Sequence, residues 1–379
     1  MKVLHIASGG SFCGIATYTT NLITHFPSDS EVSHSFEAIP SKESLSQRSA
    51  HEIYEWADGL ILKCKDYDVI HIQNEFGLFA GDNPLSFGLK VFYRILRGLK
   101  KEGKKVAVTF HSEPVFLKAL GLLNFEEKKC AKLWAKMGKF FTKKNSFLAI
   151  VHTDSSHKIF KRTGFLNCKV VVHGVIEREV EHNEIHPDRT ITLSLFGYIS
   201  EYKGHEFALS ILDLLPSNFH LSVIGGRHPE SHGEEIGHLL KVATELDLLR
   251  RVRITGWVTP DEANFHQKQS DISLAPYQTS ELSASGAVTW SLTSGNPVIA
   301  SNVRAFRAMN RQKECMLLCH PTDRLEWVWA IKRVVEDQNL NKKLISNAHE
   351  YCSMYSWTNT SNHHLKLYKN LFTNNDSMG

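Results

Sequence analysis

The sequence predicts two doubly wound α/β domains that face a cleft, each built on a parallel sheet. Short β-branched apolar runs alternate with longer helical patterns, which is typical of parallel strands covered by helices on both faces. The alternation occurs twice, on either side of a charged stretch at 177–189 that is poor in apolar residues and contains Pro187. A chain of 379 residues is also long for one core and suits two domains.

The first half contains five strand candidates and one clear helix between the first two. The helix is expected from about Ala16 to His25, and the strands are expected at 3–7, 67–73, 105–111, 147–153 and 169–175. Together they define an N-terminal domain at 1–176, followed by a linker at 177–189.

The second half repeats this organisation. A helix is expected near His205–Leu215, and the strands are expected at 191–197, 220–226, 252–258, 271–277, 297–301 and 315–320. They define a C-terminal domain at 190–354, and a helical aromatic and aliphatic stripe at 355–372 lies within a final segment, 355–379. A ligand of such a protein should bind at the carboxyl ends of the strands, in the cleft between the halves.

Composition excludes several classes of protein. The chain is 42% hydrophobic and 22% charged, as in soluble globular proteins, and its net charge of +4 is too small to imply nucleic acid. No apolar run approaches the roughly 20 residues of a membrane span, and the first strand is too short for a signal-peptide core. Seven cysteines without repeating spacing argue against a disulfide framework and for the cytoplasm. Cys315, Cys319 and His320 fit no standard zinc spacing, so we expect buried thiols and no metal site.

Positive charge is concentrated in one part of the first half. Between Leu89 and Asn145, Lys and Arg outnumber Asp and Glu by fifteen to four, within two amphipathic helical patterns. Two interpretations remain open. One is an ordinary solvated helix face, and the other is attraction to anionic lipid or to a phosphorylated acceptor.

The segment 281–301, ELSASGAVTWSLTSGNPVIAS, predicts a diphosphate site when it is read with FGYISEYKG at 196–204. Ser283, Ser285 and Gly286 stand just before a helix-like segment, whose free N–H groups and dipole favour phosphate. Lys203 can supply a point charge to the same phosphates. The structural alternative for the small residues alone is an ordinary loop, helix and turn.

Other polar or small residues follow predicted strands in the first half. Gly10 and Gly14 come after the first strand, where they indicate either a tight turn or close approach of the backbone to a ligand. His111 ends a strand and is expected to point into the cleft. Asn74 and Glu75 end the preceding strand, where Glu75 could bind an acceptor, cap a helix or form a salt bridge.

Two further strand ends are weaker candidates. His173 lies beside Gly174 at the end of a predicted strand, and Arg227 in VIGGRHPE could contact a phosphate or a base. The sequence contains no Walker A loop, no H-E-x-x-H motif, no G-x-S-x-G elbow and no paired C-x-x-C.

With these residues in place, the chain resembles the GT-B nucleotide-sugar glycosyltransferases. The resemblance is to the large, family 4-like retaining group that includes bacterial mannosyl-, glucosyl- and N-acetylglucosaminyltransferases of surface glycan assembly. It covers nearly the whole length, through GGSFCGIATYTTNL, HIQNEFGLF, TFH, VVHGV, FGYISEYKG, VIGG, ITGWV and SGNPVIAS in the family's order. It implies two Rossmann-like domains and a terminal helix at 355–379 that crosses back to the first domain.

The resemblance also implies roles for matching residues. His111 would contact the transferring sugar and Lys203 would neutralise the departing diphosphate. The diphosphate would further be held by the N–H groups of the loop at 283–286, which replace a metal ion, and by Gly10 and Gly14. The nucleotide would be bound at Gly197, Arg227, Trp257 and Val258, and the acceptor at Asn74 and Glu75. No cofactor is implied.

Two departures from the family pattern concern the nucleoside and the phosphates. Trp290 stands where a ribose-binding glutamate is usual, and Leu282 stands where its partner glutamate is usual. Tyr198 replaces the usual arginine beside the strand-end glycine. Ribose binding by that carboxylate is therefore absent or achieved differently.

The expected function is transfer of a hexose from a UDP- or GDP-sugar to a glycan or lipid-linked acceptor of surface polysaccharide, without metal and with retention. The expected location is cytoplasmic, with peripheral contact to an anionic membrane. Trp290 and Tyr198 also motivate a second reading, a non-catalytic sugar-nucleotide-binding subunit. A third is another GT-B enzyme, such as a sugar-nucleotide 2-epimerase or a synthase with a soluble acceptor.

Overall fold

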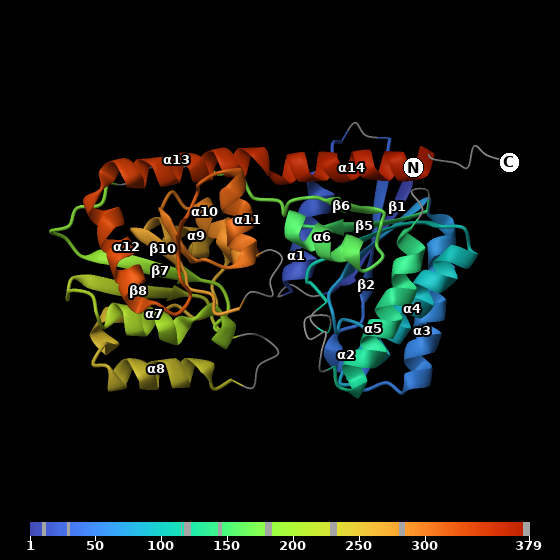
Figure 1. Cartoon of the computed structure of the whole chain (residues 1–379), viewed down its shortest axis with the longest axis horizontal. Coiled ribbons are helices and arrows are strands. Elements are labelled where there is room, and N and C mark those ends of the chain that lie inside the picture. The colour runs from blue at the N-terminus through green and yellow to red at the C-terminus, as the bar shows by residue number, and fades with distance from the viewer. Residues whose placement is uncertain are drawn as a thin grey trace. The chain divides into compact units, whose positions relative to one another are not determined.

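The chain folds into two compact units. Unit 1 comprises Met1–Gly174 and Trp357–Gly379, and unit 2 comprises Val175–Ser356. The computed structural model (Figure 1) describes residues 1–9, 13–28, 31–114, 116, 123–142, 146–178, 184–227, 233–279 and 285–373.

Each unit is built on a six-stranded parallel sheet, which confirms the predicted fold class. The first sheet has the order β2-β1-β3-β4-β5-β6, with β1 Lys2–Ser8, β2 Ser33–Ile39, β3 Val69–Asn74, β4 Lys105–Phe110, β5 Phe147–Val151 and β6 Cys168–Val170. The second has the order β12-β11-β10-β7-β8-β9, with β7 Ile191–Phe196, β8 Phe219–Ile224, β9 Val252–Ile254, β10 Ile272–Ala275, β11 Val298–Ser301 and β12 Leu317–Cys319.

The strands of unit 1 are apolar on both sides because helices cover both faces of the sheet. Alternate residues point to opposite faces, so Val3 packs with Leu367 and Leu371 of the last helix, while Leu4 packs in the core on the other side. The helices of this unit are α1 Gly14–Thr24, α2 Lys42–Ser46, α3 Ala50–Lys63, α4 Leu85–Lys101, α5 Phe125–Gly138, α6 Asp154–Arg162 and α14 Trp357–Thr373.

Unit 2 repeats this layering. Figure 1 shows α7 and α8 on one side of the strands and α10 and α13 on the other. Its helices are α7 His205–Leu212, α8 Glu235–Glu245, α9 Pro260–Lys268, α10 Gly286–Leu292, α11 Arg304–Gln312, α12 Arg324–Glu336 and α13 Gln338–Met354. A short helical turn, Glu201–Lys203, precedes α7.

Helix starts are specified locally by capping boxes. In each box the capping side chain accepts from the backbone N–H three residues later, and a glutamate there binds back to the cap, which is worth about 1 kcal/mol. The pairs are Ser49 with Glu52 in α3, Asn124 with Glu127 in α5, and Thr259 with Glu262 in α9.

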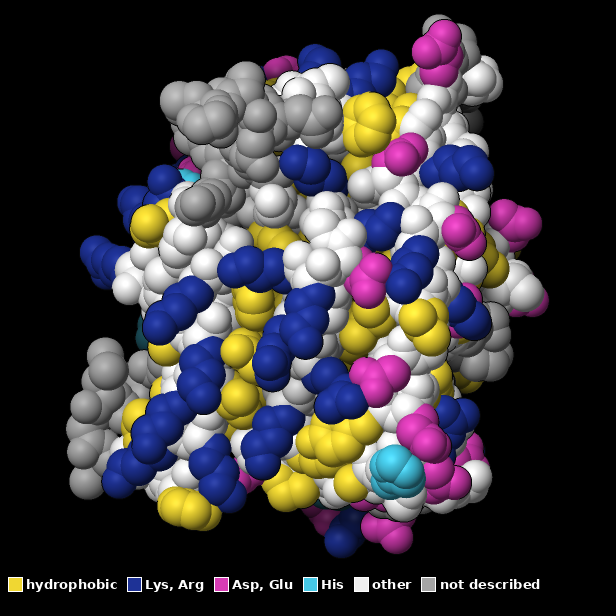
Figure 2. Space-filling view, turned by 90° about the vertical axis from the view of Figure 1, so that its right-hand side faces the viewer, with side chains coloured by type: hydrophobic (Ala, Val, Ile, Leu, Met, Phe, Trp, Pro, Cys, Tyr) yellow, Lys and Arg dark blue, Asp and Glu magenta, His cyan; other side chains and the backbone are white. Residues whose placement is uncertain are grey.

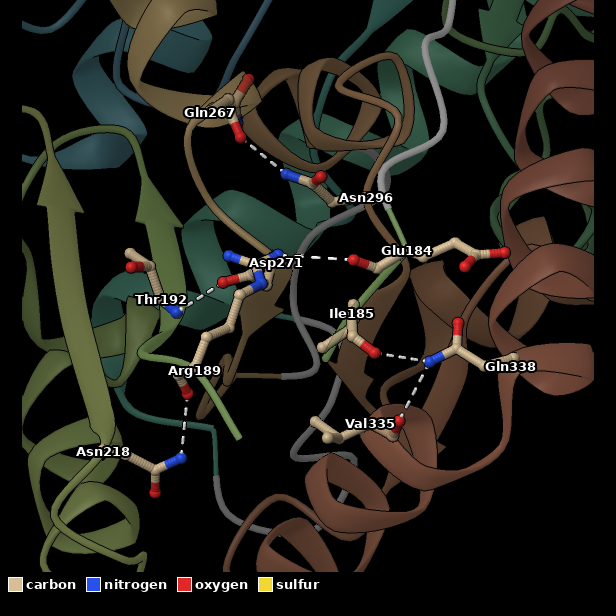
Figure 3. A network of polar contacts seen from close by, with 10 residues as sticks. All are labelled: Glu184, Ile185, Arg189, Thr192, Asn218, Gln267, Asp271, Asn296, Val335 and Gln338. Atoms are coloured by element: carbon tan, nitrogen blue, oxygen red, sulfur yellow. Dashed lines mark hydrogen bonds and ion pairs between the residues drawn. The ribbon is translucent and has the colours of Figure 1, made fainter. Parts of the chain in front are cut away.

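The charged stretch expected as a linker lies within unit 2, and its residues 184–189 are anchored there (Figure 3). Arg189 Nη2 donates to buried Asp271 at 2.5 Å, and Asp271 also accepts from the backbone N–H of Thr192 at 2.8 Å. Gln338 donates to the carbonyl of Ile185 at 2.6 Å, and Ile185 is only 1% exposed. These contacts hold residues 184–189 against the second sheet, while 179–183 lie outside the described residues.

Several elements differ from the expected ones. Strand β2 was not expected, because its sequence SHSFEAI mixes polar and apolar residues as an edge strand does. Strands β6 and β9 are only three residues long, so His173 and Trp257 lie after their strands and not within them. The final helix begins at Trp357, and its apolar stripe fills one face of the first sheet.

Candidate active site

The strand order of unit 2 marks one place where a ligand should bind. Strand β7 pairs with β8 on one side and with β10 on the other, so the strand order reverses at β7. The switch point lies between β7 and β10. Ligands of open α/β sheets bind at the carboxyl ends of the strands flanking such a switch point. Here strand β7 is followed by Gly197, and strand β10 is followed by Pro276.

Gly197 is required at this position for both conformation and space. Its φ of +109° lies in the region that L side chains rarely adopt. A Cβ atom on it would also collide with Lys203 Nζ and lie 3.3 Å from the Cβ of Ala287 in the first turn of α10. The lysine ammonium and the start of α10 therefore meet beside Gly197.

Lys203 is buried, with 5% of its surface exposed, and burial lowers its pKa to about 8. Its Nζ lies 5.6 Å from the ring centre of Tyr198. No carboxylate among the described residues forms an ion pair with it. A buried ammonium without a carboxylate is costly, so this position is suited to a bound anion.

The start of α10 offers hydrogen-bond donors near the same place. Ser285 caps the helix, since its Oγ accepts from the backbone N–H of Val288 at 3.4 Å, and it is bonded to the hydroxyl of buried Tyr277 at 2.9 Å. The N–H groups of Gly286 and Ala287 have no acceptor within the helix. Ser283, the other expected member of this loop, lies outside the described residues.

The expected nucleotide residues follow three adjacent strands of the same sheet. Trp257 follows β9, is 51% exposed, and its ring lies 5.6 Å from that of Tyr198 after β7. Arg227 follows β8, is exposed, and forms a backbone bridge with Ile199. Val258 comes next to Trp257 and is partly buried. The side chains of Tyr198 and Trp257 thus form an aromatic pair at the edge of the sheet.

Trp290, which stands where a glutamate was expected, has a packing role. The guanidinium carbon of Arg178 lies 4.2 Å from the centre of its ring, and the ring of Phe196 lies 5.4 Å away. Arg178 is oriented by a 2.7 Å hydrogen bond to Asn264 Oδ1. The indole therefore occupies the position where a ribose-binding glutamate was expected, and it offers no acceptor for ribose.

In unit 1 the strand-end residues also lie at one edge of the sheet. The backbone N–H of His111, after β4, donates to the carbonyl of Asn74, the last residue of β3, at 3.0 Å. Tyr18 of α1 lies 4.8 Å from the His111 ring, one helical turn after Gly14, which opens that helix. Asn74 is buried and Glu75 is exposed, while Gly10 lies outside the described residues.

Sequence reasoning missed the groups that hold His111. Its Nε2 lies 2.9 Å from Gln73 Oε1, and its Nδ1 lies 3.3 Å from His152 Nε2. His152 follows β5 at the same sheet edge, so the rule that selected His111 also selects it. His173 lies close by, where its Nδ1 donates to the carbonyl of Gly174 at 2.7 Å.

All seven cysteines are free thiols, and burial raises the pKa of Cys315 and Cys319 to about 12. Within the described ranges, no three His, Cys, Asp or Glu side chains are grouped as metal ligands. No helix in the described part of the chain is long and apolar enough to cross a membrane.

Solved structures of several known proteins share this architecture. HepE from Anabaena in complex with UDP is 14% identical, with a TM-score of 0.71 over 97% of this chain and 100% of that chain. Sucrose-phosphate synthase from Thermosynechococcus elongatus is 16% identical, with a TM-score of 0.71 over 99% and 100%. The lipopolysaccharide outer core galactosyltransferase WaaB is 14% identical, with a TM-score of 0.63 over 97% and 99%. At these identities the likeness shows the fold.

Sequence comparison adds a family match for unit 2. No curated protein sequence matches the chain significantly. The family model for glycosyl transferases group 1 matches residues 175–351, nearly all of unit 2. The chain therefore has the GT-B fold and carries a glycosyl transferases group 1 domain at residues 175–351.

Proposed function

We propose that this chain transfers a hexose from a UDP- or GDP-linked sugar to a glycan or lipid-linked acceptor in surface polysaccharide synthesis. The observation that carries the proposal is Lys203, a buried ammonium that has no carboxylate partner among the described residues and lies beside Gly197 and the start of α10. A sugar-nucleotide diphosphate supplies the missing anion. The N–H groups at Gly286 add donors to the same phosphates.

The chemistry needs little from the protein beyond charge and position. The bond between the anomeric carbon and the phosphate oxygen breaks, a bond to the acceptor oxygen forms, and the acceptor proton passes to the departing phosphate. Negative charge develops on that diphosphate, and fixed donors such as Lys203 stabilise it without reorganising. We propose that transfer occurs on one face of the sugar, with retention, and that these groups act in place of a metal ion.

The remaining residues are assigned to parts of the donor and the acceptor. Trp257 and Val258, with Gly197 and Arg227, are proposed to bind the nucleoside. His111 is proposed to contact the transferred sugar, and Asn74 and Glu75 the acceptor. Gly10, Gly14, Ser283 and Ser285 are proposed to lie along the diphosphate.

The nature of the donor is suggested by the relatives. HepE has been solved with UDP and with UDP-glucose, so a UDP-hexose is the first donor to test. GDP-hexoses should be tested alongside it.

A lipid-linked acceptor is supported by one surface of unit 1. Helix α4 packs against α5, and both present exposed cations that no carboxylate of the described residues pairs with. We call this set, together with Lys139 just after α5, the basic face, and it consists of Lys90, Arg97, Lys100, Lys101, Lys128, Lys132, Lys136 and Lys139. Figure 2 shows Lys and Arg crowded on this side of the chain. We propose that it docks the enzyme on the anionic inner surface of the cytoplasmic membrane.

The proposal is tested by nucleotide release. The protein is incubated with UDP- and GDP-hexoses, with and without a lipid extract as acceptor source. Release of one nucleotide that depends on the acceptor supports hexosyl transfer. Measurable binding without release from any donor would contradict it, and conversion of the sugar without an acceptor would indicate epimerase chemistry.

A further inference from the structure

The side chain of His111 belongs to a partly buried chain of hydrogen bonds that ends on a backbone carbonyl. His152 Nδ1 lies 2.9 Å from the carbonyl oxygen of Val171, and His152 Nε2 lies 3.3 Å from His111 Nδ1. His111 Nε2 lies 2.9 Å from the side-chain amide of Gln73. His152 is 3% exposed and Gln73 is fully buried.

The carbonyl at one end fixes where the protons are. A carbonyl oxygen only accepts, so His152 Nδ1 must carry a proton. Burial lowers the pKa of His152 to about 3 and that of His111 well below its usual value, so both rings are neutral near pH 7. A neutral His152 then has a lone pair on Nε2, and its neighbour His111 must donate from Nδ1.

The amide of Gln73 must follow the same direction. If Gln73 Oε1 faces His111, as found, His111 must donate from Nε2 and keep a lone pair on Nδ1. That lone pair would then face the lone pair of His152 Nε2. A half-turn of the amide places its N–H group toward His111 Nε2 and removes this conflict. The other end of the amide meets His71 only at 3.3 and 3.4 Å, so the exchange disturbs little there.

We infer that His152 is a positioning residue, which, through the Val171 carbonyl, fixes His111 as the neutral tautomer with its proton on Nδ1. His111 Nε2 then accepts from the Gln73 amide while Nδ1 donates to His152, so neither ring nitrogen offers a proton to the sugar. This inference rests on the proposed contact of His111 with the transferred sugar. It assigns His111 an orienting role in place of acid catalysis.

The test measures the tautomer directly, by heteronuclear NMR of nitrogen-labelled histidine side chains at about pH 7. Signals of the two rings are assigned from their loss in His111→Gln and His152→Gln. The expected result is a protonated Nδ1 and an unprotonated Nε2 on His111. His152→Gln, which keeps a donor for Val171 and an acceptor for His111, should preserve that tautomer. His152→Phe, which keeps only the ring shape, should shift it.

His173→Phe is the matched control, because its ring lies 5.6 Å from that of His152 and its Nδ1 bonds to Gly174 instead. It should leave the tautomer of His111 unchanged. A proton on Nε2 of His111 in the wild-type protein, or an unchanged His111 in a folded His152→Phe, would overturn the inference. Nucleotide release is measured separately, so absence of transferase activity would refute the proposed function while the tautomer still decides this one.

Discussion

The Nζ atom of Lys203 lies where a side chain on Gly197 would begin. Strand β7 ends at Phe196, the backbone turns through a positive φ at Gly197, and the lysine returns to the same point from the following helical turn. A buried charge is thereby held against bare backbone at a strand end.

Replacing Gly197 by alanine should displace this ammonium. The Cβ collides with Nζ, and the positive φ adds strain of roughly 1–2 kcal/mol. We expect kcat/KM for the donor to fall by more than about tenfold, within the range found for loss of one transition-state donor. Steady-state kinetics measure this. Gly237→Ala on α8, where a Cβ meets nothing within 4 Å, is the control and should keep full activity.

Lys203→Met should stabilise the ligand-free protein. Burial lowers the lysine pKa from 10.5 to about 8, so the unfolded chain binds more protons between these values. The free-energy cost of burying the charged lysine is complete below about pH 8 and disappears as the pH rises through 10.5. Its order of magnitude is roughly 3 kcal/mol near pH 7.

Thermal unfolding at several pH values measures this effect. The melting temperature of Lys203→Met should exceed that of the wild type near pH 7, and the two should converge at alkaline pH. Lys241→Met is the control, since Lys241 is 73% exposed and its ammonium remains in contact with water. A less stable Lys203→Met would show that the lysine already has a stabilising partner.

Trp257→Ala should weaken nucleotide binding. Its half-exposed indole, which follows β9, can stack on a base, which is worth about 1–3 kcal/mol. Trp329→Ala is a matched control, because Trp329 is 57% exposed on α12 of the same unit. Calorimetric titration with UDP and GDP compares them. Equal affinities for the two variants would remove Trp257 from the nucleotide site.

The basic face should bind anionic vesicles. Each lysine near such a surface contributes about 1 kcal/mol, and salt screens it. Changing Lys100, Lys132 and Lys136 to glutamine should therefore reduce co-sedimentation with phosphatidylserine vesicles by more than about tenfold.

The control for this surface changes three exposed lysines of unit 2 to glutamine, Lys241, Lys332 and Lys342. It has the same net charge as the first variant and should bind vesicles as the wild type does. If both variants bind alike, or if wild-type binding ignores salt, membrane docking by this face is wrong.

The sheets could be predicted from the sequence because buried parallel strands leave a strong local signal. Runs such as VLHIA and PVIAS are apolar on both faces, and each became a strand. Strand β2 gave no such signal, since an edge strand is partly exposed and its pattern resembles a loop. The ends of strands could be predicted less well than their presence. Strand β9, for example, ends before Trp257.

The site could be predicted only in part. Lys203 and Gly197 are six positions apart and follow one strand, so local sequence was sufficient to associate them. The contact of Arg178 with Trp290 joins residues far apart in the chain, so no local sequence pattern predicts it. The same holds for His111 and His152, which meet only because β4 and β5 are neighbours in the sheet.

The central claim is that Lys203 holds the donor diphosphate. Calorimetric titration of wild type and Lys203→Met with UDP and with uridine tests it, because only UDP carries the phosphates. We predict that the variant loses at least about tenfold in affinity for UDP, as expected for a charged contact, and binds uridine as the wild type does. Unchanged affinity for UDP, or an equal loss for both ligands, would contradict the claim.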